Sequence, residues 1–242
     1  MRLRTFRSFW VPLRVGSREA EQHYPAPRTA DALEAVGVFL LILIHIWFVS
    51  RRARLAWLVI LAPVMYSHWR RGESLRWLGF RRDNFVRCVR DFAPLILGLA
   101  GVPIVLGALY GTLHTSSSMA PLAFVTYYCV WGTFQQYALN GFFVNRLSGA
   151  AAPEEQRWVP LLAATLFGAV HAPNWFLVTV TFTLGLLCTR IYMTYRNLYF
   201  LGVAHGLIGS ALYISVPDWL SLHFYIGPRA LRYMALAPWT RT

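Results

Sequence analysis

The chain contains no lysine, and few of its residues are charged. All 23 of its Lys+Arg residues are arginine, and charged residues make up 14% of the 242 positions, against about 25% in soluble domains. Hydrophobic residues make up 57%. The net charge is +13, but the arginines fall between apolar runs and form no single basic stripe, which argues against nucleic-acid binding. The pattern is typical of a membrane protein whose loops face anionic lipid.

Acidic residues are missing from two long stretches of the chain. None occurs between Asp91 and Glu154, and none between Glu155 and Asp218. The apolar runs in these stretches therefore hold no carboxylate that could act as a base. We expect Glu154 and Glu155, which lie in a polar loop, to be solvated. The odd number of cysteines and their spacing favour small buried side chains over metal ligands; these cysteines are Cys88, Cys129 and Cys188.

The apolar runs predict an all-α fold, a polytopic transmembrane helix bundle of about seven spans. A helix needs about 20 apolar residues to cross the hydrocarbon core. The predicted spans are residues 32–49, 55–69, 92–113, 120–147, 158–171, 175–195 and 197–216. A short apolar segment around residues 219–226 would be an eighth, but we do not expect it to cross fully. We expect His45, alone in the first span, to be a packing residue.

The distribution of arginine divides the chain and predicts its orientation. Placing the N-terminus in the cytoplasm puts 17 arginines on the inner side and 6 on the outer side, as the positive-inside rule requires. The predicted parts are a basic cytoplasmic arm (1–31), two N-terminal transmembrane helices (32–69), an Arg-rich amphipathic connection (70–91), a polytopic core (92–216) and a C-terminal tail (217–242). We predict an integral protein of a bacterial inner (plasma) membrane.

Two adjacent glutamines interrupt the fourth predicted span. A buried amide without a partner costs about 2–7 kcal/mol, so Gln135 and Gln136 need hydrogen-bond partners. Gln136 and Asn140 are four residues apart and share one helix face. The best partners in other spans are His171 and His205.

Two further pairs have the same helical spacing. Phe167 lies four residues before His171, and His205 lies four residues before Gly209, where we expect the glycine to leave a gap. Polar residues in membrane helices usually face the bundle interior and mark functional sites, although they can simply hydrogen-bond helices together. We favour the first interpretation and expect the two imidazoles to meet in one cavity.

The order of these motifs resembles the CPBP family of intramembrane proteases, which includes the Rce1-type CAAX prenyl endopeptidases and the Abi proteins. That family carries a Glu-Glu-x-x-x-Arg motif, then Phe-x-x-x-His, then His-x-x-x-Asn or Asp, on three membrane helices. The corresponding segments here are QQYALN at 135–140, FGAVH at 167–171 and HGLIG at 205–209. The resemblance extends over residues 73–215.

The resemblance implies a glutamate and two histidines that activate water for peptide hydrolysis, with the second histidine and its Asn at the oxyanion. Here Gln135 and Gln136 replace the glutamates, Asn140 replaces the arginine and Gly209 replaces the last Asn. An amide cannot accept the proton that a carboxylate base would take. Two hypotheses stay open, and with them the enzyme assignment.

The first hypothesis is an intramembrane endopeptidase that acts on a membrane-associated or prenylated peptide through His171 and His205, with an atypical Gln-Gln site. The second is an inactive pseudoprotease that binds or sequesters a membrane peptide or protein, in an immunity or chaperone-like role. A transporter or channel would need charged pathway residues inside the spans and inverted repeats, and we expect neither.

The expected partners are the lipid bilayer and a membrane-associated peptide or protein, and no nucleic acid. No cofactor is expected with certainty. Zinc is the alternative, but a zinc site needs at least a third ligand beside His171 and His205, and the amide oxygens of Gln135, Gln136 and Asn140 are poor zinc ligands.

Overall fold

The computed structural model describes residues 28–49, 56–114 and 119–236, and these residues form helices and loops without any strand. The first helices are α3 (Thr29–Ile44), the π-helical η1 (His45–Val49), α4 (Trp57–Arg70), α5 (Leu75–Leu78) and α6 (Phe85–Leu109). Next come α7 (Pro121–Gln136), the π-helical η2 (Tyr137–Val144), α8 (Asn145–Ala150), the 3₁₀-helical η3 (Pro153–Trp158) and α9 (Val159–Ala169). The last are α10 (Trp175–Tyr195), α11 (Leu198–Ser215), α12 (Asp218–Ser221), the 3₁₀-helical η4 (Leu222–Phe224) and α13 (Gly227–Leu236). The all-α prediction is confirmed for these residues.

Within the described residues, four helical segments are long and apolar enough to cross a membrane: Thr29–Val49, α6, α10 and α11. The predicted number of seven spans is not confirmed. At 1.5 Å per residue, the 14 residues of α4 and the 11 residues of α9 reach only about 21 and 17 Å, less than the roughly 30 Å of the hydrocarbon core. The helix that begins as α7 continues without a break through η2 and α8.

Two segments outside the long helices differ from the sequence-based expectation. The Arg-rich connection holds the single turn α5, which begins after Ser74 and ends at Gly79, whose φ of 101° is left-handed, and its residues 85–91 already belong to α6. Trp77 and Leu78 are buried, so this turn packs into the protein. In the C-terminal tail, the amphipathic helix α13 follows the short α12. The arm is described only from Arg28 onward.

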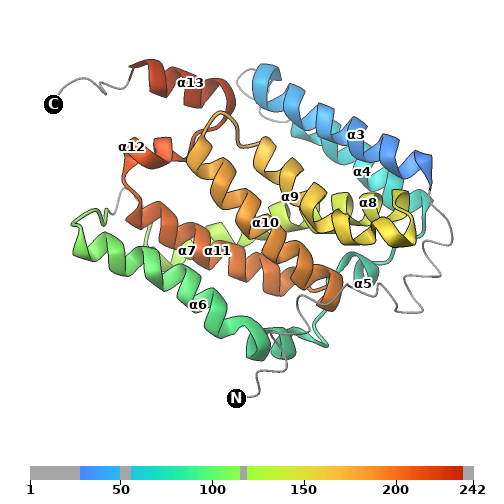
Figure 1. The fold of residues 1–242 in the computed structure, drawn as a ribbon, viewed down its shortest axis with the longest axis horizontal. Helices are drawn as coiled ribbons and strands as arrows, with labels where there is room; N and C mark the ends of the chain where they lie inside the picture. Colours follow the sequence, from blue (N-terminus) through green and yellow to red (C-terminus); the bar gives the residue numbers. More distant parts are fainter. Residues whose placement is uncertain (1–27, 50–55, 115–118, 237–242) are drawn as a thin grey trace.

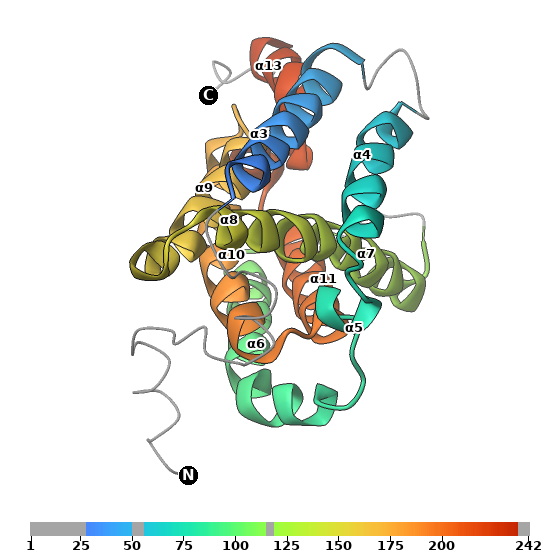
Figure 2. The same cartoon turned by 90° about the vertical axis from the view of Figure 1, so that its right-hand side faces the viewer.

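Helices lie on two sides of the long helix that α7, η2 and α8 form together. In Figures 1 and 2, α3 and α4 lie on one side of η2 and α8, and α6, α10 and α11 lie on the other.

Close packing of α7 against α11 positions the polar groups. A Cβ atom on Gly206 would lie 2.5 Å from the Cα of Cys129, and one on Gly202 would meet the side chain and backbone of Thr133. On the facing helix, a Cβ on Gly132 would lie 3.0 Å from the His205 Cβ. Small residues let membrane helices approach closely, so these glycines bring His205 against α7.

Candidate functional site

The predicted site begins where the long central helix changes from α-helical to π-helical. Gln136 is the last residue of α7, and Asn140 lies inside the π-helical segment η2. π-helical insertions in α-helices are frequent at functional sites. Gln136 is 1% exposed and Asn140 is 0% exposed, so their amides depend on partners within the protein.

Gln136 and His205 are hydrogen-bonded partners. The Gln136 Nε2 lies 3.1 Å from the His205 Nδ1, and the Asn140 amide donates to the Gln136 Oε1 at 2.6 Å. The Asn140 Oδ1 is buried and has no hydrogen-bond partner among the described residues. A chain of three polar side chains therefore crosses between η2, α7 and α11.

His171 comes close to this chain through Phe167. Its Nδ1 lies 2.7 Å from the Phe167 carbonyl oxygen; because a carbonyl only accepts, this contact places the proton on Nδ1 and leaves Nε2 as an acceptor. The Phe167 ring centroid lies 5.1 Å from the His171 ring and 6.3 Å from the His205 ring. The two imidazoles thus flank one aromatic ring.

A cavity of about 820 Å³ opens beside His171, within the range of about 300–1,000 Å³ typical of small-molecule sites. Gln135 and His171 line it, whereas Gln136, Asn140 and His205 do not. The structure therefore divides the predicted residues into two that face the cavity and three that form a hydrogen-bonded set behind it. No described carboxylate lines this cavity.

The expected gap at Gly209 is filled. A Cβ atom there would lie 3.1 Å from the Cδ1 of Tyr128, because the ring of this α7 residue packs over the glycine. The spacing of residues 205–209 predicted a shared face correctly, but it could not indicate which neighbouring side chain covers that face.

The region that holds this geometry also matches a known family. A family model described as type II CAAX prenyl endopeptidase Rce1-like matches residues 117–211. Over these residues the chain is similar to that family. The match confirms the resemblance drawn from the motifs, and it covers all five predicted site residues. No curated protein and no solved structure matches this chain.

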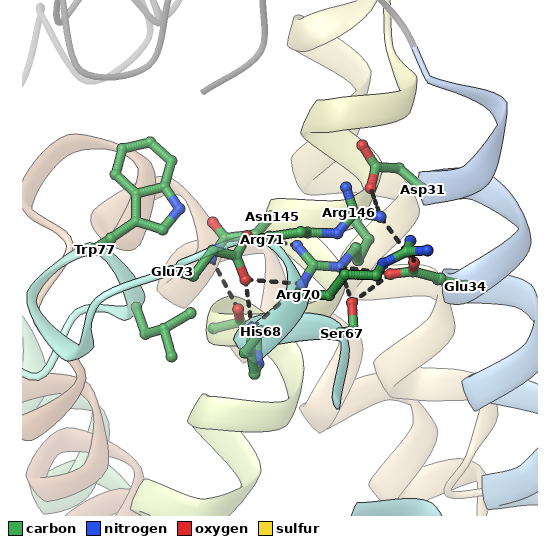
Figure 3. Close-up of polar contacts among 12 residues, drawn as sticks. Asp31, Glu34, Ser67, His68, Arg70, Arg71, Glu73, Trp77, Asn145 and Arg146 are labelled. Carbon is green, nitrogen blue, oxygen red and sulfur yellow. Dashed lines mark hydrogen bonds and ion pairs between the residues drawn. The ribbon is translucent and has the colours of Figure 1, made fainter. Parts of the chain in front are cut away.

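Sequence reasoning missed a second polar cluster, built around Arg146 just after the Rce1-like motif (Figure 3). Arg146 is 0% exposed. Its guanidinium donates two hydrogen bonds to Glu73, at 2.7 and 2.8 Å, and one to Glu34, at 3.0 Å. It also contacts the Ser67 Oγ at 3.1 Å and the His68 Nδ1 at 3.2 Å.

This cluster corrects the expectation that the spans hold no charged residues. Residue 34 falls in the first predicted span and residue 146 in the fourth. Two charges of opposite sign inside apolar runs were a readable signal, since intramembrane charges usually pair with one another. The cluster joins α3, α4 and α8, and thereby anchors the long helix that carries Gln135 and Gln136.

Glu73 is ionised by its surroundings. Burial alone would raise its pKa, but hydrogen bonds from Arg146 and the contact with His68 outweigh burial and lower the pKa to about 2. The carboxylate therefore stays ionised and bound to its partners in this cluster. We regard it as structural, because it is not part of the cavity wall.

The residues at the site do not by themselves form a zinc site. Zinc requires at least three protein ligands, and among the described residues no three His, Cys, Asp or Glu side chains are grouped so that they could hold a metal ion. His171 and His205 would need a third donor from outside this set.

Proposed function

We propose that this CAAX-protease-like integral membrane protein binds a membrane-associated peptide in the cavity beside His171. The observation that carries the proposal is the cavity itself, an apolar space on whose wall the Rce1-like region places Gln135 and His171. The amide and the imidazole can hydrogen-bond a peptide group, while the apolar wall accepts side chains or a lipid modification.

We further propose that binding occurs without cleavage, as in a pseudoprotease. Peptide hydrolysis needs a base that takes a proton from water, and a tuned carboxylate or imidazole can do this whereas an amide cannot. Gln135 is the group on the wall at the position of the family's glutamate, and Gln136 already donates to His205. The remaining roles for Gln135 and Gln136 are to hold the helices together and to orient a ligand.

A histidine-only hydrolase is the second candidate. Its support is the contact between the His171 Nδ1 and the Phe167 carbonyl, which leaves Nε2 free to accept a proton from a water molecule at the cavity. Imidazole is a common general base near neutral pH. In this mechanism His171 would activate water, and His205 would act only through residues that it contacts.

One experiment tests binding and separates the two candidates. The purified protein in detergent is titrated with a fluorescent farnesylated CAAX peptide; fluorescence anisotropy follows binding, and mass spectrometry follows cleavage. Ala138 lines the cavity, so Ala138→Phe should weaken binding about tenfold or more. Val130→Phe, at an exposed position on α7, is the matched control and should bind normally.

The results have distinct meanings. Binding without a cleaved product supports the pseudoprotease, and cleavage that His171→Ala abolishes supports the hydrolase. Equal binding by the Ala138→Phe and Val130→Phe variants would overturn the assignment of the cavity as the peptide site.

We also propose a membrane topology of seven spans in a bacterial inner membrane, with the N-terminus in the cytoplasm. Three crossings would be added to the four long apolar segments: α4, the helix that begins as α7, and α9. The arginine distribution supports this orientation. An odd number of spans places the C-terminus outside, so a C-terminal alkaline phosphatase fusion should be active and a C-terminal green fluorescent protein fusion dark. The reverse pattern would contradict the topology.

A further inference from the structure

Basic side chains gather at one end of the cavity, where three segments meet. The Gly227 N–H of α13 donates to the Ala172 carbonyl just after α9, at 2.9 Å. A Cβ atom on Gly227 would lie 2.7 Å from the Cγ2 of Ile46 in η1. His45, His171 and Arg229, one from each of these segments, all line the cavity.

Two of these groups have no anionic partner among the described residues. Arg229 lies over the ring of Tyr225, with its guanidinium carbon 3.8 Å from the ring centroid, and makes no ion pair with a described carboxylate. The His45 Nδ1 is buried and has no hydrogen-bond partner in the described structure. His45 is therefore not the satisfied packing residue that the sequence predicted.

The rest of the cavity wall is apolar. Val38, Val64, Phe142 and Phe143 line it and belong to one buried hydrophobic cluster. The cavity thus combines an apolar wall with a cationic end. A peptide that is neutral along its length would use the wall and leave the cation at Arg229 without a counter-charge.

We propose that the cavity binds a single-chain anionic amphiphile, with its acyl chain along the apolar wall and its carboxylate or phosphate head at Arg229 and His45. A guanidinium and an anionic oxygen form strong charge-assisted hydrogen bonds, and the aromatic ring of Tyr225 holds the guanidinium in place. Such a ligand covers His171, so it competes with the peptide. The inference goes beyond the proposed function, because lipid binding can hold whether or not a peptide binds.

The test measures binding of brominated palmitate to the full-length protein in detergent. Trp57 and Trp131 line the cavity, so bromine in the acyl chain should quench tryptophan fluorescence. The matching brominated fatty alcohol is the neutral control ligand. We expect the acid to bind about tenfold or more tightly than the alcohol, and each methylene removed from the chain to weaken binding about fourfold.

Arg229→Gln should abolish the preference for the acid and leave binding of the alcohol unchanged, which also shows that the variant is folded. Arg232→Gln, an exposed position on the same helix that does not line the cavity, is the matched control and should keep the preference. Competition by lysophosphatidic acid as against unlabelled palmitate then separates a phosphate head from a carboxylate head.

Three results would overturn the proposal. Equal binding of acid and alcohol would show that no anion is recognised. Equal losses in the Arg229→Gln and Arg232→Gln variants would show that both arginines act only on detergent or lipid at the surface. Quenching that survives replacement of both Trp57 and Trp131 by phenylalanine would place the probe outside the cavity. A failed peptide titration alone would leave the proposal standing.

Discussion

The Gln136 amide and the His205 imidazole meet at 3.1 Å between Nε2 and Nδ1. Since the Gln136 carbonyl oxygen accepts from Asn140 at 2.6 Å, its amide nitrogen is the donor, and His205 must accept through Nδ1. A carboxylate in place of Gln136 would instead accept from that nitrogen. The glutamine therefore reverses the direction of this hydrogen bond and selects the His205 tautomer with its proton on Nε2.

Gln136→Leu should lower the free energy of unfolding by about 1–3 kcal/mol, because it leaves the buried donor of Asn140 and the Nδ1 of His205 without partners. Unfolding in mixed micelles measures the loss. Gln135→Leu is the matched control: Gln135 faces the cavity, so its loss should cost less than about 1 kcal/mol. Equal effects would contradict the division between the two glutamines.

Gly206→Ala should separate α7 from α11. The new Cβ would lie 2.5 Å from the Cys129 Cα, and because this neighbour is backbone, the helices must move apart at a cost of about 1–3 kcal/mol. Gly98→Ala in α6, where a Cβ meets nothing within 4 Å, should be neutral or stabilising by up to about 1 kcal/mol. Thermal unfolding of both variants measures this difference. If the Gly206→Ala variant is as stable as the Gly98→Ala variant, the prediction is wrong.

Arg146→Met should be among the most destabilising single substitutions outside the cavity. Removal of one partner of a buried ion pair costs about 3–5 kcal/mol, and here it leaves the buried Glu73 without its arginine partner, whereas Glu34 keeps its ion pairs with Arg70 and Arg71. Arg157→Met, at an exposed position, should change stability by less than about 0.5 kcal/mol. Chemical unfolding compares the two variants, and a small effect at Arg146 would show that water replaces its contacts.

The contribution of Glu73 to stability should disappear in acid. Its folded pKa of about 2 lies below its ordinary value of 4.5, so the carboxylate stabilises the fold fully above pH 4.5 and loses this effect as the pH falls toward 2. The difference in unfolding free energy between wild type and Glu73→Gln should therefore be largest at neutral pH and shrink in acid. A difference that is constant with pH would assign the effect to packing.

Local sequence was sufficient for the helices whose apolar runs are long. The predicted span 175–195 coincides with α10, and the predicted span 197–216 differs from α11 by one residue at each end. A long apolar run must satisfy its backbone internally, and a helix does this without help from other segments. The runs around α4 and α9 are shorter, and there helix length alone does not confirm a crossing.

The sequence by itself determined the helical class, the order of the motifs and the candidate polar residues, because each depends on neighbours within a few positions. Only the tertiary structure decided that Gln135 faces the cavity while Gln136 pairs with His205, and that Arg146 binds Glu34 and Glu73. These contacts join segments far apart in the chain. They depend on how each helix is rotated and how closely its glycines let it approach another, which no single run of residues specifies.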